Sequence, residues 1–171
     1  MFRMRRGWIV FLVIVACLAF QVSCYGADPK DLLNKAAPRI TGVDWLSGSQ
    51  SFPVSNRVNL VVFWNSRYKS SVDALDSMQK LYNTYNSRGL VVIGLNDSGE
   101  AKSVLSMIEG QKGIKFPLGT GSGATKAAGD YFLKGVPVAF LINKSGNIVH
   151  IIEGYTSNFE AELSSKINSL L

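Results

Sequence analysis

Cysteine is scarce in this sequence of 171 residues: Cys17 and Cys24 are its two copies, and both lie near the N-terminus. The chain from residue 28 onward has no thiol, so a folded domain there is held together by its core without disulfides. Histidine is rarer still, with His150 as its single copy. Because zinc sites are built from clustered cysteine and histidine side chains, the sequence predicts no metal site, and it gives no sign of a bound cofactor.

Acidic residues are fewer than basic ones, and the formal net charge is +6. Three of the positive charges, Arg3, Arg5 and Arg6, lie at the N-terminus, and the remaining 15 basic residues (18 less 3) exceed the 12 acidic ones by 3. These residues are scattered, without a basic run or interleaved aromatic side chains, so nucleic-acid binding is not expected. The hydrophobic content of 47% is that of a globular protein with one domain.

Residues 1–27 have the pattern of a signal peptide or a membrane anchor. Basic residues come first, followed by the apolar run 8–20 and then by small and polar residues. The apolar run is shorter than the ~20 residues that a membrane-spanning helix needs, which favours an export signal over an uncleaved anchor. We therefore expect the domain formed by residues 28–171 to be extracytoplasmic, in a periplasm or cell envelope, with membrane attachment as an open alternative.

Cys17 and Cys24 are both candidates for lipidation. Each ends a short segment (Ile-Val-Ala-Cys and Gln-Val-Ser-Cys) that resembles a bacterial lipoprotein box, whose cysteine is acylated and becomes the new N-terminus. The first segment has little apolar sequence before it, and the second has Gln21 where the box usually has leucine. Cleavage by ordinary signal peptidase between residues 24 and 27 is the alternative.

Hydrophobic runs predict an α/β domain with a β-α-β unit near its start. Apolar stretches bounded by turn residues predict four strands, at residues 58–63, 90–95, 138–142 and 148–152. The last two strands are expected to form a hairpin. The stretch 119–125 is rich in glycine and serine and is predicted to be a flexible loop.

Apolar residues at helical spacing predict three helices in the same domain. The first covers residues 71–88, with Ser70 or Ser71 as its N-cap. The second runs from an N-cap at Asp97 or Ser98 to residue 113. The third closes the chain and begins with a capping box at residues 157–160.

Four short segments are specific when they are taken together. They are Phe63-Trp64, Gln79-x-Leu81-Tyr82, Ile114-Lys115-Phe116-Pro117, and Tyr-Phe-Leu-Lys-Gly-Val-Pro-Val-Ala-Phe-Leu-Ile-Asn at 131–143. These segments resemble the TlpA/ResA-like branch of the thioredoxin superfamily, and the resemblance covers residues 38–171. It implies a thioredoxin-like fold, in which helices flank a central mixed β-sheet. It also implies a cis peptide bond at Val136-Pro137 that faces the loop after Trp64 and shapes a substrate groove.

The sequence departs from this family where the chemistry takes place. Tyr68 and Ser71 occupy the two cysteine positions of the C-x-x-C motif. Disulfide exchange needs a thiolate nucleophile and a second thiol, and neither a phenol nor a hydroxyl replaces them. Nearby family positions differ as well, at Arg67, Ala74, Asp76 and Val138. We therefore expect no thiol–disulfide oxidoreductase activity and assign no catalytic residue.

The same loop is instead predicted to be part of a binding groove for an envelope protein or peptide. The candidate binding residues are Trp64, Arg67, Tyr68, Lys69, Ser70, Ser71, Val136 and Pro137. Arg67 and Lys69 flank a helix start, whose free N–H groups favour anions, and Lys134 is expected nearby. These cations could bind a carboxylate, and a solvated basic loop without a ligand is the alternative.

The resemblance leaves other functions open. By family, the protein would be a redoxin-type oxidoreductase with a role in cytochrome c maturation or envelope redox chemistry. A non-thiol catalyst is a further alternative, but a Ser71 nucleophile would need a base within reach, and His150 is expected on the surface of the last strand. The third alternative is that the domain is a structural remnant that binds no ligand. The G-x-G-x-x-A pattern at 119–124 is not in the context of a dinucleotide site.

Overall fold

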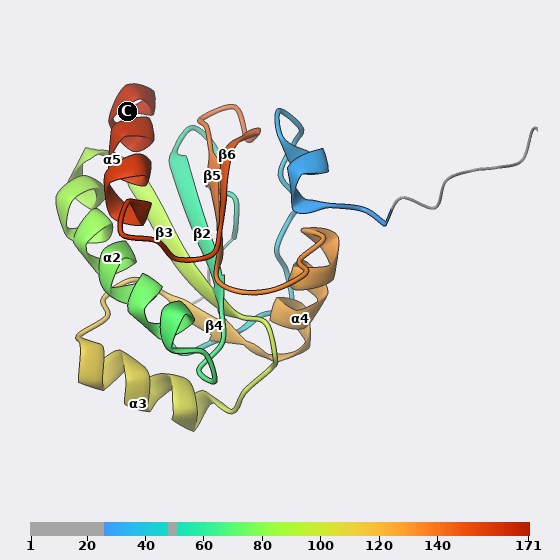
Figure 1. Cartoon of the computed structure of the whole chain (residues 1–171), viewed down its shortest axis with the longest axis vertical. Helices are drawn as coiled ribbons and strands as arrows, with labels where there is room; N and C mark the ends of the chain where they lie inside the picture. The colour runs from blue at the N-terminus through green and yellow to red at the C-terminus, as the bar shows by residue number, and fades with distance from the viewer. Residues whose placement is uncertain (1–25, 48–50) are drawn as a thin grey trace, which may run out of the picture.

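The computed structural model describes residues 26–47 and 51–171 (Figure 1). The predicted leader, including Cys17 and Cys24, lies outside these residues apart from Gly26 and Ala27. No helix in the described part of the chain is long and apolar enough to cross a membrane. The signal segment and its lipidation therefore stay predictions.

Within the described residues, a mixed sheet of six strands forms the centre of the fold, in the order β1-β4-β3-β2-β5-β6. β2, β3 and β4 are parallel, and β1, β5 and β6 are antiparallel to the strands they pair with. The strands are Asp44–Trp45 (β1), Val58–Trp64 (β2), Leu90–Asn96 (β3), Leu118–Thr120 (β4), Val138–Ile142 (β5) and Ile148–Glu153 (β6). The predicted architecture, including the hairpin of β5 and β6, is confirmed.

Helices cover both faces of this sheet (Figure 1). One face packs against α2 (Lys69–Tyr85), α3 (Lys102–Lys112) and α5 (Phe159–Leu170), and a short 3-10 helix, η2 (Asn86–Arg88), follows α2. The other face packs against α4 (Gly121–Asp130) and the 3-10 helix η1 (Pro29–Leu32).

The central strand β2 is buried along its whole length and contributes to two cores. Its even-numbered residues, from Val58 to Trp64, belong to the core under α2, α3 and α5. The odd-numbered Val61 and Phe63 belong to the core under α4. This alternation follows from the two-residue period of a strand, and it explains why the sequence of β2 is a continuous apolar run.

The predicted helix starts are wrong in detail. α2 begins at Lys69 with Tyr68 as its N-cap, and no side chain caps it, so neither Ser70 nor Ser71 has this role. The capping box at residues 157–160 is also absent, because the N-cap Asn158 makes no side-chain capping bond.

The start of α3 differs for an identifiable reason. The side-chain oxygen of Asn96 accepts hydrogen bonds from the backbone N–H groups of Ser98 and Glu100, at 3.2 and 3.1 Å. These bonds hold residues 97–100 as a turn at the end of β3, and α3 begins only at Lys102. Asp97 and Ser98 are therefore not helix caps, and Asp97 is available for another role.

The predicted flexible loop at residues 119–125 is also wrong, because β4 ends at Thr120 and α4 begins at Gly121. Here glycine serves close packing. A Cβ atom at Gly123 would overlap the backbone of Thr41 and Gly42, which lie against α4. Glycine is needed at this position because no side chain fits between the two backbones.

We predict that Gly123→Ala lowers the free energy of unfolding by about 1–3 kcal/mol, because the added methyl group meets backbone that does not move aside easily. Urea denaturation measures this change. Gly129→Ala is the matched control, since Gly129 lies in the same helix and a Cβ atom added there would meet nothing within 4 Å. The control is expected to gain up to about 1 kcal/mol from helix propensity. Equal effects at the two positions would contradict the packing role of Gly123.

Candidate functional site

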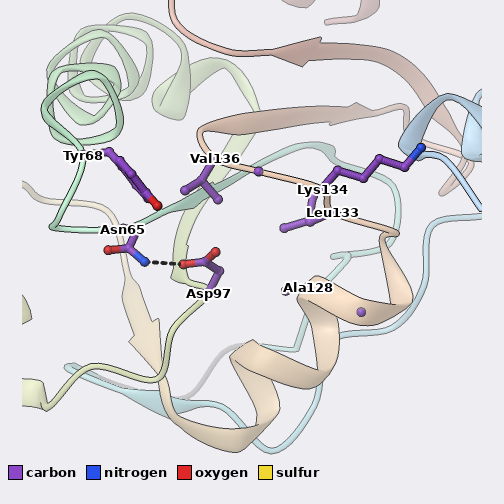
Figure 2. Close-up of a pocket in the computed structure, with 9 residues that line it drawn as sticks. Asn65, Tyr68, Asp97, Ala128, Leu133, Lys134 and Val136 are labelled. Atoms are coloured by element: carbon purple, nitrogen blue, oxygen red, sulfur yellow. Dashed lines mark hydrogen bonds between the residues drawn. The ribbon is translucent and has the colours of Figure 1, made fainter.

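A pocket of about 440 Å³ lies at the carboxyl ends of β2 and β3 (Figure 2). In open α/β sheets this edge is the usual place for ligands. Four segments meet there: the turn that follows β2, the turn that follows β3, the end of α4, and the loop before β5. The lining residues are Asn65, Tyr68, Asp97, Ala128, Gly129, Leu133, Lys134, Gly135 and Val136.

The turn between β2 and α2 is fixed by its own hydrogen bonds. The side-chain oxygen of Asn65 accepts from the backbone N–H of Arg67 at 3.0 Å, and the backbone N–H of Tyr68 donates to the carbonyl of Asn65 at 3.3 Å. Tyr68 is then the N-cap of α2, with an extended backbone and a side chain that is 55% exposed. Its hydroxyl end is directed toward the pocket (Figure 2).

Ser71 lies one helical turn further on and is completely buried. Its hydroxyl group has no hydrogen-bond partner among the described residues. A buried thiol behaves as a small hydrophobic group, whereas a buried hydroxyl without a partner is unfavourable. The hydroxyl of Ser71 is therefore an unfavourable group at this buried position, and its assignment to the second cysteine position stays a prediction.

Asp97 provides the pocket's carboxylate. Asn65 donates from its side-chain nitrogen to Oδ1 of Asp97 at 3.0 Å, which joins the turns after β2 and β3 (Figure 2). Burial raises the pKa of Asp97 above its ordinary value, and the nearby charge of Glu100 raises this pKa further. The hydrogen bond from Asn65 and the charge of Arg67 act in the opposite direction.

Glu100 holds the turns after β2 and β3 in place through hydrogen bonds. Its carboxylate accepts a hydrogen bond from the hydroxyl of Ser66 at 2.7 Å and another from the side-chain nitrogen of Asn96 at 2.9 Å. Its backbone carbonyl accepts from the hydroxyl of Thr120 at 2.6 Å. The carboxylate thus has partners on both oxygens and is a positioning group for the loop that carries Tyr68.

The opposite wall of the pocket is the segment before β5. The Val136–Pro137 peptide bond is cis, as the sequence predicted. Val136 and Leu133 point toward the space between this segment and Asp97 (Figure 2). Pro137 itself is buried beneath the wall, where its carbonyl accepts from the N–H of Gly154 at 2.8 Å.

The predicted cation cluster is not present at the pocket. The ammonium group of Lys69 pairs with Asp73 at 2.6 Å, one turn along α2. Lys134 lines the pocket with its chain, but its ammonium group is directed away and pairs with Asp28 at 2.7 Å (Figure 2). The two lysines are thus paired within the chain, and anion binding by this loop stays a prediction.

The structure brings some of the predicted binding residues together and separates others. Tyr68 and Val136 line the pocket. Three of the predicted residues are buried and do not line the pocket: Trp64, Ser71 and Pro137. Three others are exposed but also do not line it: Arg67, Lys69 and Ser70.

Sequence reasoning missed Asn65, Asp97 and the residues of α4. One signal could have found Asn65 and Asp97, because each comes shortly after a predicted buried strand. The carboxyl ends of parallel strands meet at one edge of a sheet, so these two residues would be expected to lie close together. The contribution of Ala128 and Gly129 had no such signal, since residues 119–125 were expected to form a loop and the short helix expected after them was not linked to a site.

The described residues form no metal-ligand cluster, and the single histidine of the chain lies away from the pocket. In residues 26–47 and 51–171, no three His, Cys, Asp or Glu side chains gather as a metal site requires. His150 lies on β6, and its Nε2 is 2.7 Å from the carboxylate of Glu162 on α5. It does not line the pocket and gives Ser71 no base.

The β2-α2-β3 unit and the mixed sheet, with the segment before β5 across the pocket from the start of α2, define a thioredoxin-like fold. The thioredoxin domain of a thiol-disulfide oxidoreductase from Bacteroides vulgatus matches with a TM-score of 0.69 at 18% identity, covering 80% of this chain and 98% of that one. StoA from Bacillus subtilis matches with a TM-score of 0.61 at 18% identity, covering 78% and 97%.

Proteins of similar sequence point to one group within the thioredoxin-like fold. Thiol-disulfide oxidoreductase ResA from Bacillus cereus is 27% identical over 168 residues, which cover 93% of this chain and 95% of the relative. No protein-family model matches the chain. The chain is thus similar in sequence and fold to the ResA/TlpA-like redoxin proteins, and its own sequence has Tyr68 and Ser71 at the start of α2.

We predict that Ser71→Ala raises the free energy of unfolding by about 1 kcal/mol, because it removes a buried hydroxyl that has no partner. Urea denaturation of the two proteins measures the difference. Ser70→Ala is the control for helix propensity alone, since Ser70 is the exposed neighbour in the same helical turn and its replacement gains about 0.5 kcal/mol or less. A loss of stability in Ser71→Ala would contradict this account of the buried hydroxyl.

Proposed function

We propose that this protein is an extracytoplasmic binding protein that holds an extended polypeptide segment in the pocket between Tyr68 and Val136, without exchanging thiols and disulfides. The observation that carries the proposal is an open pocket at the start of α2, where Tyr68 and Ser71 replace the reacting groups of the family. The partner would be a protein or peptide of the cell envelope.

The chemistry of the chain supports a role without catalysis. Thiol–disulfide exchange proceeds by attack of a thiolate on a disulfide sulfur, and the chain has no sulfur that can act so after residue 24. A tyrosine hydroxyl and a buried serine hydroxyl form no exchangeable bond with sulfur. The names of the relatives describe oxidoreductases, and this chain keeps their fold without those groups.

The surface of the pocket supports a polypeptide as its occupant. Neither the backbone N–H nor the carbonyl of Val136 makes a hydrogen bond to another described residue, so both are available to an extended chain. Across the pocket, the exposed ring of Tyr68 offers a large apolar contact with a polar end, as is common at binding surfaces. A polypeptide can use both walls at once.

The proposed location rests on residues 1–27. Their basic start and apolar run support export, and Cys17 or Cys24 would attach the protein to a membrane if either is acylated. Cleavage without acylation would leave a free domain. Labelling with a fatty-acid probe, with Cys17→Ser and Cys24→Ser as controls, distinguishes these forms.

We predict that the full chain in detergent, with Cys17 and Cys24 replaced by serine, binds short peptides from an unfolded secreted protein in fluorescence anisotropy. Gly129→Trp is expected to weaken this binding by about tenfold or more, because an indole side chain at the pocket wall excludes the peptide. The variant replaces an exposed helical glycine that has open space around its Cβ position.

Gly110→Trp is the matched control for this test. Gly110 is also an exposed helical glycine with open space, but it lies on α3 and does not line the pocket. Its affinity for the peptides should equal that of the parent. Equal weakening in both variants would place the contact outside the pocket, and the absence of peptide binding in the parent would overturn the proposed function.

A further inference from the structure

One oxygen of the Asp97 carboxylate makes no hydrogen bond with any other residue that the structure describes. Oδ1 accepts the hydrogen bond from Asn65, whereas Oδ2 makes no hydrogen bond or ion pair with another described residue. Lys134, the cation whose chain lines the same pocket, has its ammonium group on Asp28 instead (Figure 2). The pocket therefore presents a half-buried carboxylate that forms no ion pair with any of the described residues.

The fold does not require a charge at this position. The one side-chain hydrogen bond of Asp97 has Asn65 as its donor, and a neutral amide oxygen could accept it equally well. Removing a carboxylate from water is unfavourable, and here the nearby carboxylate of Glu100 adds to the penalty while Arg67 offsets part of it. A bound cation would relieve this penalty.

The walls above Asp97 are apolar. Ala128 on α4 and the side chains of Leu133 and Val136 enclose the space that leads to the carboxylate (Figure 2). A ligand that fits apolar walls leading to a carboxylate has an alkyl stem and a positively charged end. Lysine and arginine side chains have both, and their stems pack readily on apolar surfaces. The ring of Tyr68 at the rim adds a face on which a guanidinium group can stack.

We propose that the pocket selects a lysine or arginine side chain of the bound polypeptide, with the carboxylate of Asp97 as the counter-ion and Ala128, Leu133 and Val136 as the walls for the alkyl stem. This inference rests on the proposed function, because it names the side chain by which a bound polypeptide is recognised. It differs from the alternative raised by the sequence, in which basic residues of the loop could bind a carboxylate.

The test uses the full chain with both leader cysteines replaced by serine, and short acetylated peptides of alanine, threonine and valine that differ at one central position. That position is lysine, arginine, norleucine or glutamate. The lysine and arginine peptides are expected to bind about tenfold or more tightly than the norleucine peptide, because a charge-assisted hydrogen bond forms in a partly buried site. The glutamate peptide is expected to bind more weakly than all others.

Asp97→Asn is expected to reduce the ratio of lysine to norleucine affinity to near one, since its amide keeps the shape of the side chain and removes the charge. Asp130→Asn is the matched control and should keep the ratio, because Asp130 is a carboxylate of α4 that pairs with Lys126 and does not line the pocket. Circular dichroism confirms that each variant is folded, and the peptide series on the parent decides the question if Asp97→Asn does not fold.

The outcomes separate the two proposals. Equal binding of the lysine, norleucine and glutamate peptides, or a lysine preference that survives Asp97→Asn, would overturn the role of Asp97 while peptide binding stands. A failure of every peptide to bind would overturn the proposed function and this inference with it.

Discussion

The burial of β2 on both faces is the constraint on which the rest of the structure depends. Seven consecutive buried residues, Val58 to Trp64, form the middle of the sheet and supply both cores. Because the cores are fixed on either side, the strand ends at one defined place, and the turn that follows is directed to the edge of the sheet. Asn65 then joins this turn to Asp97 in the turn after β3, and Tyr68, the N-cap of α2, lines the same pocket as Val136.

Much of this fold could be predicted from the sequence, because its main strands are long apolar runs. β2, β3, β5 and β6 were predicted in this way, and the resemblance to the family supplied the thioredoxin-like arrangement and the cis bond before Pro137. The short strands β1 and β4 were missed, since two or three residues held by pairing leave no periodic signal. The start of α4 was missed because Gly123 suggested a loop, whereas tertiary contact with Gly42 requires glycine inside a helix.

The candidate site was predicted only in part, for a similar reason. Tyr68 and Val136 were found through the motifs around them, and both line the pocket. The ion pairs of Lys69 and Lys134 were not predicted, because these side chains were judged from their positions in the chain. Their partners, Asp73 and Asp28, are known only from the three-dimensional arrangement. Asp97 lacked a motif and was taken for a helix cap, whereas Asn96 holds that turn in the structure.

The central claim is that this chain keeps a thioredoxin scaffold and uses it without thiol exchange. The most direct measurement is the rate at which the unmodified full chain accelerates the reduction of insulin disulfides by dithiothreitol, with Tyr68→Cys plus Ser71→Cys as the positive control. The account predicts the uncatalysed rate for the unmodified chain, and an intramolecular disulfide and faster reduction for the control. Acceleration by the unmodified chain that disappears in Cys17→Ser plus Cys24→Ser would contradict it and identify the protein as an oxidoreductase.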